Sequence, residues 1–447
     1  MRRLILLLTL LPFAAQAQTN AQFEKWFEPA TLRFDYHHAG DATTEEYFFD
    51  ELRREPHWAG SRTTLIDDTG FGSQMFRIVD AATGQTIYSR TYCTLWNEWQ
   101  FTAEAKQLRK SMPESVVFPL PKNEVRIEFH TRDRNGAWVK KYEQSIDPRS
   151  YFIAQYPLRH ETFDVEINGA PEHTVDIVLL PEGYTAAERK KFEQAAKNFA
   201  RDIFSYEPYR ELRKKFNIRA VWTPSQDSGV TMPGAGEWRN TSAKASFWTF
   251  DSERYQMTED FQNLRDQAAH VPYELIYVLS NSDKYGGGGI YNFYALSSAG
   301  DYTSRAGVYI HEFGHLLLGL GDEYIGGVSY DEQSMYPAHR EPWEVNLTTL
   351  VDFESKAWSR MLPEGTPIPT PLTRPAPIHI TDPKATAPPP MESVRADELG
   401  VYEGGGYVTK GVYRPWPNCL MNNLHTIGEF CPVCEAGIRN HIEFLCR

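Results

Sequence analysis

The spacing of apolar residues changes near residue 170, and this change limits the fold more than any other feature of the chain. From about residue 28 to 155, short alternating or β-branched segments are separated by turn-rich stretches such as DDTGFG and DRNGA. That pattern predicts an all-β sandwich. Beyond it, buried strands such as HTVDIVLL and YELIYVLSN alternate with helical segments, which predicts an α/β domain. Two domains are therefore expected, over residues 18–165 and 166–447.

The second domain is expected to divide in two. Its first half, residues 166–321, carries the strand and helix alternation. From residue 322 to 447 regular structure thins, and residues 362–392 are dense in proline, as in an extended loop. A short final helix is predicted near residues 432–445.

The first seventeen residues have the composition of a secretory signal. Arg2 and Arg3 precede an apolar run over Leu4–Phe13, and Ala15-Gln16-Ala17 provides a small-residue cleavage site. The apolar run is shorter than the ~20 residues that span a bilayer. We therefore expect an exported protein without a membrane span, in the periplasm, at the cell surface or in the medium.

Composition and charge narrow the class of partner. The chain is 41% hydrophobic and 23% charged, as in globular proteins, and its formal net charge is −13. An acidic surface repels nucleic acids and anionic membranes. No nucleic-acid partner is expected, and a monomer is the working expectation for the oligomeric state.

The string HEFGH places two histidines four residues apart in the apolar segment RAGVYIHEFGHLLL, which Gly319 can end as a helix. On a helix His311 and His315 lie about 6 Å apart along the axis, so both can reach one metal ion. Glu312 points about 100° away and is better placed to accept a proton from water. The alternative, a pair of core histidines, would bury polar groups without partners at a cost of several kcal/mol.

A tetrahedral catalytic zinc ion usually takes three protein ligands and leaves a fourth position to water. Gly319 and Gly321 let the chain turn back after the helix, and acidic residues follow at once. Asp322 is the favoured third ligand because it lies nearest the turn and its short side chain suits a tight return. Glu323 and the more distant Glu332 remain alternatives.

This arrangement predicts amide-bond hydrolysis of a protein or peptide. Zinc lowers the pKa of bound water toward ~7, Glu312 accepts the proton, and the hydroxide attacks a carbonyl. The segment IYNFYALSS follows Gly286–Gly289, which is typical of a flexible turn. We expect IYNFYALSS to form a strand at a sheet edge above the cleft, where an extended peptide can pair with it.

Several strings occur in order along the second domain: LLPEGYT, DSGVTMPG…NTS, YELIYVLSN…YGGGG, HEFGHLLLGLGDEY and NCLMNNLHTIGEFCPVC. Together they resemble the IgA-peptidase family of bacterial zinc metallopeptidases, a metzincin-like group, over about residues 172–440. Residues 20–160 are similar to the β-sandwich domain that precedes the catalytic domain in many of these proteins. The resemblance implies an α/β zincin-type catalytic domain after an all-β sandwich.

The same resemblance implies one catalytic zinc ion bound by His311, His315 and Asp322, with Glu312 as general base. Met421 is similar to the methionine of the Met-turn, which in metzincins forms an apolar floor beneath the metal. The alternative for Met421 is an ordinary core methionine.

The chain departs from the general metzincin string HExxHxxGxxH. Its glycine comes one position late, at Gly319, and Gly321 stands where the third histidine is usual. Two residues after Met421, where some metzincins carry a tyrosine that contacts substrate, stands Asn423. Three other tyrosines are expected to be structural: Tyr324, Tyr402 and Tyr413.

Four of the five cysteines lie in the last 29 residues of a chain expected to be exported, where disulfides persist. CPVC is compatible with half a zinc site or a redox motif, but the outer cysteines lie twelve residues away on each side, unlike common zinc spacings. Along a continuous helix, Cys434 and Cys446 are about 18 Å apart, beyond the ~7 Å reach of a disulfide. The expected bond joins Cys419 to Cys431 or to Cys434.

Three functions are compatible with these features. The first is an exported zinc endopeptidase. The second is a protein with a vestigial zinc site whose β-sandwich binds glycans or host proteins, although an intact Glu312 argues against it. The third is a zinc hydrolase acting on small amides or cell-wall peptides.

Overall fold

The computed structural model describes residues 22–326, 335–372, 398–424 and 429–447. The predicted signal over residues 1–17, the alternative ligand Glu332 and most of the proline-dense segment lie outside these residues. Among the described helices, none combines the length and the apolar character needed to cross a membrane.

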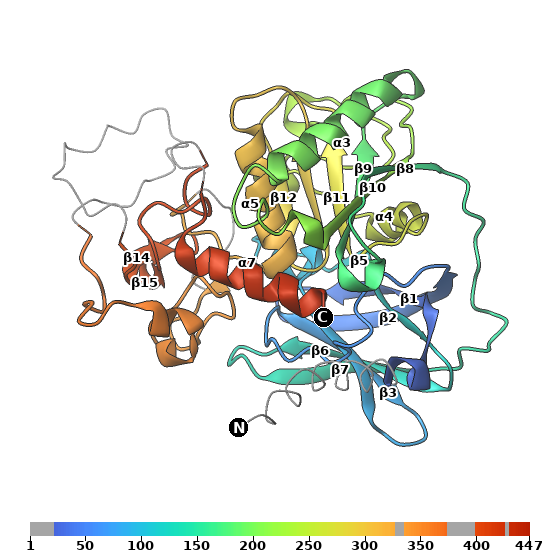
Figure 1. Cartoon of the computed structure of the whole chain (residues 1–447), viewed down its shortest axis with the longest axis horizontal. Helices are drawn as coiled ribbons and strands as arrows, with labels where there is room; N and C mark the ends of the chain where they lie inside the picture. The colour runs from blue at the N-terminus through green and yellow to red at the C-terminus, as the bar shows by residue number, and fades with distance from the viewer. Residues whose placement is uncertain (1–21, 327–334, 373–397, 425–428) are drawn as a thin grey trace, which may run out of the picture.

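The N-terminal part is β-rich, as its alternating segments predict (Figure 1). One antiparallel sheet has the strand order β2-β1-β5 and another has the order β4-β3-β6-β7. The strands are β1 (Phe27–Gly40), β2 (Glu45–Glu55), β3 (Gln74–Asp80), β4 (Thr86–Tyr92), β5 (Lys110–Pro121), β6 (Val125–Arg132) and β7 (Trp138–Ile146). Phe34 and Phe118 from the first sheet share one buried core with Ile78 and Phe129 from the second.

The second part is a mixed α/β domain around a sheet of order β12-β13-β11-β9-β10-β8. The pairs β10·β9, β11·β9 and β11·β13 are parallel, whereas the edge strands β12 and β8 are antiparallel to their neighbours. The strands are β8 (Glu161–Glu166), β9 (Val175–Glu182), β10 (Phe216–Trp222), β11 (Leu275–Ser280), β12 (Gly287–Ile290) and β13 (Tyr294–Ser298). Strand β8 spans the boundary expected at residues 165 and 166.

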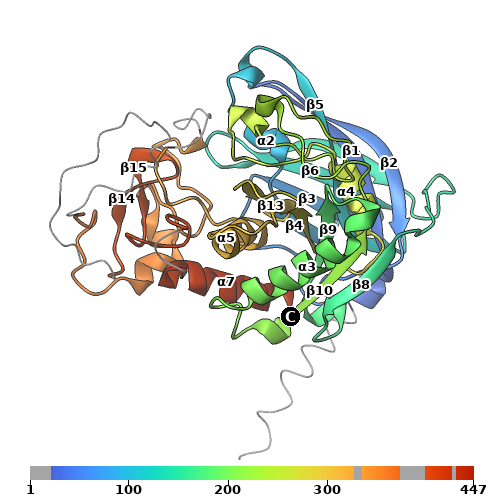
Figure 2. The same ribbon diagram turned by 90° about the horizontal axis from the view of Figure 1, so that it is seen from above.

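Alternate residues of β9 face opposite cores, as the period of a strand requires. Ile177 and Leu179 share one core with α3 (Arg189–Ile203) and α5 (Arg305–Leu318). On the other face, Val178 and Leu180 pack in a core with α4 (Phe261–Ala268) and with residues of the N-terminal part. The sheet is therefore covered on both faces (Figure 2).

The two parts are joined by an apolar interface. Helix α2 (Leu95–Trp99) follows β4 and is capped by the Thr94 side chain, which accepts a hydrogen bond from the Asn97 backbone N–H. Trp96 and Trp99 are fully buried in the core that also holds Val178 and Leu180 of β9. This burial fixes α2 against the α/β domain.

The C-terminal part is mostly irregular, as expected after residue 322. It contains the hairpin of β14 (Tyr402–Gly405) and β15 (Val408–Arg414), and the final helix α7 (Pro432–Leu445). Helix α7 covers the residues predicted for the final helix and packs on α5, where a Cβ on Gly437 would lie 2.8 Å from Leu318 Cδ2. Figure 1 shows α7 starting beside the hairpin and passing below α5 at a steep angle toward the C-terminus.

The edge strand differs from the one predicted. The segment IYNFYALSS is not a single strand, because residues 291–293 form a turn between the end of β12 and β13. Strand β13 lies inside the sheet, and the edge above α5 is β12, the glycine run expected to be a turn. A Cβ at Gly289 would lie 2.4 Å from the backbone oxygen of Glu312. Only glycine allows this strand to approach the helix so closely.

Helix α5 covers the predicted segment and ends at Gly319, which has a φ of 66°. The Gly319 N–H bonds the carbonyl of His315 at 2.8 Å, and the Leu320 N–H bonds that of Gly314 at 3.3 Å. The bond from the Gly319 N–H to the His315 carbonyl is the αL motif of helix termination, which favours glycine at the left-handed position. It directs the chain back toward the histidines.

Gly319→Ala is therefore expected to destabilise the fold strongly. The left-handed conformation costs ~1–2 kcal/mol for a residue with a side chain, and the new Cβ would lie 2.3 Å from the Trp343 ring. Thermal unfolding of the whole chain measures the loss. Gly326→Ala is the matched control, because Gly326 also has a positive φ of 70° but a Cβ there would meet nothing within 4 Å. An equal loss in both variants would contradict the steric part of this prediction.

Candidate active site

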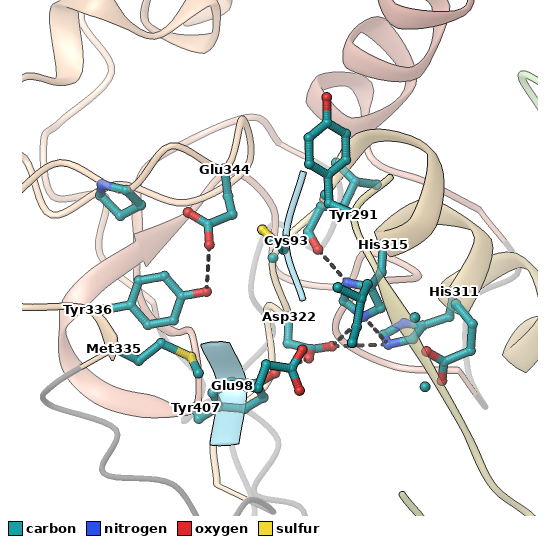
Figure 3. Close-up of a pocket in the computed structure, with 18 of the residues that line it drawn as sticks. Cys93, Glu98, Tyr291, His311, His315, Asp322, Met335, Tyr336, Glu344 and Tyr407 are labelled. Atoms are coloured by element: carbon teal, nitrogen blue, oxygen red, sulfur yellow. Dashed lines mark hydrogen bonds and ion pairs between the residues drawn. The ribbon is translucent and has the colours of Figure 1, made fainter. Parts of the chain in front are cut away.

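The described cleft runs between α5, the edge strand β12 and the C-terminal segments, and three of the predicted ligands meet in it. His311 Nε2 lies 3.0 Å from Asp322 Oδ1, His315 Nε2 lies 3.3 Å from the same oxygen, and the two Nε2 atoms are 3.1 Å apart. Figure 3 shows both imidazoles and the Asp322 carboxylate converging on one point.

The hydrogen bonds of the imidazoles fix their tautomers. His311 Nδ1 donates to the Leu420 carbonyl at 3.3 Å, and His315 Nδ1 donates to the Leu320 carbonyl at 2.5 Å. A carbonyl oxygen only accepts, so in each neutral ring the proton is on Nδ1 and the Nε2 lone pair faces the cluster. Asp322 Oδ1 is buried and has no hydrogen-bond partner among the described residues.

These three atoms fit the ligand set of one metal ion. Tetrahedral ligands at the zinc distance of about 2.0–2.1 Å are separated by edges of about 3.3–3.4 Å. The measured edges of 3.0, 3.1 and 3.3 Å are close to that value. Imidazole nitrogen with carboxylate oxygen is also a usual donor set for a catalytic zinc.

The electrostatics of the cluster favour positive charge at its centre. Burial lowers the pKa of His315, but Asp322 and Glu312 outweigh burial and raise that pKa to about 9. Burial raises the pKa of Asp322, yet the two histidines hold it well below its usual value. A buried carboxylate that stays ionised beside two imidazoles requires a cation, either a proton or a metal.

The position of Asp322 is set by its backbone and by one tyrosine. Its carbonyl accepts from the Gly406 N–H at 2.7 Å, and the next residue, Glu323, donates its N–H to the Met421 carbonyl at 2.9 Å. The Tyr407 hydroxyl donates to Asp322 Oδ2. The hairpin and the segment around Met421 therefore clamp the aspartate from both sides.

Glu323 points away from the histidines. Its Oε1 accepts from Asn346 Nδ2 at 2.9 Å and lies 3.5 Å from Cys434 Sγ, in a separate buried cluster of possible metal donors. Of the two adjacent acids, Asp322 alone joins the histidines. The third alternative, Glu332, lies outside the described residues.

Glu312 lies on α5 beside the edge strand. A Cβ at Gly287 would come within 3.1 Å of its Oε1, so the carboxylate faces β12 across the top of the helix. Burial raises the pKa of Glu312, and the charges of His311 and His315 oppose that rise. The side chain lines the same cleft as both histidines.

Met421 is fully buried near α5. A Cβ at Gly314 would lie 3.4 Å from its Sδ, so the thioether packs against the helix that carries the histidines. The turn that holds Met421 is closed by the Asn422 and Asn423 N–H groups, which both donate to the Cys419 carbonyl at 2.9 Å. Its role as a floor beneath a metal remains a prediction.

The cleft also holds residues that no sequence motif indicated. Tyr324, expected to be structural, lines the cleft, and its ring stacks with His311 at a centroid distance of 6.5 Å. Arg254 Nη2 donates to the Tyr324 hydroxyl at 3.3 Å, and Tyr407 binds Asp322. Arg254 and Tyr407 lie 70 and 85 residues from their partners, so only tertiary structure reveals them. Tyr402 and Tyr413 lie in the hairpin strands, outside the cleft lining.

The N-terminal part supplies one wall of the cleft, although its sequence contains no catalytic cluster. Cys93, Asn97, Glu98 and Arg132 line the cleft from this part. The Tyr255 hydroxyl donates to Glu98 across the interface at 2.5 Å. The cleft is thus built by both parts of the chain.

Cys419, Cys431 and Cys434 lie close together, but the predicted disulfide is absent. All five lie in described residues and all are free thiols. Cys419 Sγ and Cys434 Sγ are 3.8 Å apart, well beyond the ~2.05 Å of a disulfide. The expected bond from Cys419 to Cys431 or Cys434 is therefore wrong in this structure.

A helix with two histidines, a returning carboxylate and a glycine edge strand defines a hydrolase cleft with a candidate metal centre. The sequence matches the family described as IgA Peptidase M64 over residues 164–378 and 390–442, which is more than half of the chain. Residues 22–143 match the Peptidase M64 N-terminus. The chain therefore belongs to the IgA peptidase M64 family and is a peptidase. A comparison with curated proteins found no match.

Proposed function

We propose that the chain is an exported, zinc-dependent endopeptidase with a zincin-type catalytic domain. One observation carries the proposal: the triangle of His311 Nε2, His315 Nε2 and Asp322 Oδ1, with edges of 3.0–3.3 Å. Export is inferred from residues 1–17, whose basic start, apolar run and small-residue end are typical of a secretory signal.

A zinc ion held by these three side chains would supply a Lewis acid for the scissile carbonyl and would acidify water. Glu312 accepts the proton of the attacking water and passes it to the amide nitrogen as the C–N bond breaks. Burial raises the pKa of Glu312, which is the direction that favours a general base working near neutral pH. One water is consumed, and Glu312 ends in its starting state.

The substrate is proposed to bind as an extended peptide along β12. The outer edge of this strand is already paired at Gly287, whose N–H donates to the Arg254 carbonyl at 3.2 Å. Gly289 is two residues further on, so its backbone groups face the same outer side, next to Glu312. A peptide strand pairing at Gly289 would bring its carbonyl over the histidines.

Tyr324 is proposed to donate a hydrogen bond to the oxygen that becomes negative during attack. Burial and the charge of Asp322 raise the pKa of Tyr324 well above its ordinary value, so the phenol stays protonated. Its oxygen accepts a hydrogen bond from Arg254 Nη2, and a protonated phenol is a donor of the kind that stabilises a developing oxyanion.

Tyr324→Phe is therefore expected to lower kcat by about 10–100-fold, within the range for loss of one such donor. Metal content should stay unchanged, because Tyr324 is not a ligand. Steady-state kinetics on a fluorogenic peptide together with elemental analysis measure both quantities. Tyr413→Phe, in the hairpin and outside the cleft lining, is the matched control. Equal kcat values in the Tyr324 and Tyr413 variants would show that Tyr324 does not stabilise the developing negative charge.

Chelation tests the proposed function directly. Hydrolysis of a denatured protein should stop after treatment with a zinc chelator and should return on addition of about one equivalent of Zn²⁺ at the histidine site. Cleavage-site profiling with peptide mixtures then defines the bonds cut. Undiminished hydrolysis by metal-free protein would refute zinc dependence. Bound zinc with no turnover across a broad peptide library would instead favour the vestigial alternative, which the intact ligand triangle and Glu312 do not support.

A further inference from the structure

A second group of metal donors lies behind the active site. Glu323, Cys419, Cys431 and Cys434 each offer one donor atom, and these atoms all lie within 4.8 Å of one another. All four residues are buried. They come from the segment after α5, from the Met421 turn and from the first turn of α7.

The distances in this group fit a tetrahedral ion. With Zn–S of about 2.3 Å and Zn–O of about 2.0 Å, a tetrahedron has sulfur–sulfur edges of about 3.8 Å and sulfur–oxygen edges of about 3.5 Å. Cys419 Sγ and Cys434 Sγ are 3.8 Å apart, and Cys434 Sγ lies 3.5 Å from Glu323 Oε1. A disulfide would require the two sulfurs to move together by more than about 1.5 Å.

One oxygen of the Glu323 carboxylate is satisfied by Asn346, and the other is not. Its Oε2 is buried with no hydrogen-bond partner among the described residues. The charge of the buried Arg414 acts on Glu323, but the two described side chains form no ion pair within 4 Å, and Arg414 Nη1 donates to the Gly404 and Glu403 carbonyls. A fully buried carboxylate without an ion pair is expensive unless a cation binds it.

We propose that Glu323, Cys419, Cys431 and Cys434 bind a second Zn²⁺ ion. Three thiolates and one carboxylate fill all four tetrahedral positions, so the ion has no open position for water and its role is structural. Thiolate donors also select zinc over Mg²⁺ or Ca²⁺. Sequence spacing alone obscured this site, because the CPVC pair is completed by one distant cysteine and one glutamate.

The second ion would stabilise the geometry of the first site. Glu323 is adjacent to Asp322, and the residue after Cys419 is Leu420, whose carbonyl accepts from His311. Binding at the cysteine cluster therefore ties α7 to the two segments that orient Asp322 and His311. This inference does not depend on the proposed peptidase mechanism.

The test uses the full chain with the first site removed. In His311→Ala/His315→Ala protein purified with zinc and without added reductant, elemental analysis should find one zinc per chain, against two in the wild type. X-ray absorption at the zinc edge should show sulfur neighbours at ~2.3 Å in that variant. Retention of this ion is independent of any catalytic result.

Further variants separate a bound ion from a disulfide. Cys434→Ser should lower the zinc content by one ion per chain, whereas Cys446→Ser, outside the cluster, should lower it by none. If Cys434→Ser fails to fold, the double histidine variant still decides the question. A double histidine variant without zinc, a remaining ion with only nitrogen and oxygen neighbours, or a mapped bond between Cys419 and Cys431 or Cys434 would each overturn the proposal.

Discussion

Replacing Glu312 by glutamine is expected to lower kcat for peptide hydrolysis by about 10²–10⁴-fold, the usual contribution of a general base. Glutamine has nearly the same shape but cannot accept the proton of the attacking water. Because Glu312 contributes no atom to the triangle of His311, His315 and Asp322, the variant should bind the same amount of metal. Kinetics on a fluorogenic peptide, with metal content measured on the same samples, give both results.

Glu344→Gln is the matched control for this variant. Glu344 also lines the cleft, but its carboxylate accepts from the Tyr336 hydroxyl at 3.1 Å, away from the histidines (Figure 3). The decrease in kcat for Glu344→Gln should be far smaller than the decrease for Glu312→Gln. Wild-type activity in Glu312→Gln, or equal losses in the two variants, would show that Glu312 is not the base.

Asp322→Ala is expected to abolish activity by removing the proposed third zinc ligand. Loss of a group that only supports a ligand already weakens metal binding by about 10–100-fold, so loss of the ligand itself should weaken it more. Chelator competition measures the zinc affinity of the histidine site. Activity should return only in part at high zinc concentration, because only the two imidazoles of His311 and His315 would then coordinate the ion.

Asp301→Asn is a suitable control, because Asp301 is fully exposed and precedes α5. It should keep wild-type affinity and rate. If Asp322→Ala binds zinc as tightly as the wild type, the third ligand must be a different residue.

Local sequence predicted the helix that carries the site. The apolar period, the glycine stop and the spacing of His311 and His315 are properties of one short segment, and α5 has the expected bounds. Asp322 followed from the same segment, since the turn at Gly319 returns the chain by a few residues. The change in apolar spacing near residue 170 likewise separated the β-rich part from the α/β part.

What the sequence could not predict depends on contacts between distant segments. The glycines of β12 are typical of a turn, but they pair with β13 as a strand, and only glycine lets that strand lie so close to α5. Tyr407 reaches Asp322 across 85 residues of chain. The predicted disulfide of Cys419 was wrong, and the cysteine spacing did not reveal Glu323 as the fourth member of the group that holds Cys419, Cys431 and Cys434.

The bare main chain of β12 has a consequence for selectivity. Gly287, Gly288 and Gly289 have no side chains to contact a peptide bound as proposed, so β12 can contact only the backbone of that peptide. A preference for particular amino acids would then come from the side chains elsewhere in the cleft lining, among them Tyr336 and Trp343. Substituting these residues should change which peptide bonds are cut without changing the affinity that comes from backbone hydrogen bonds to β12.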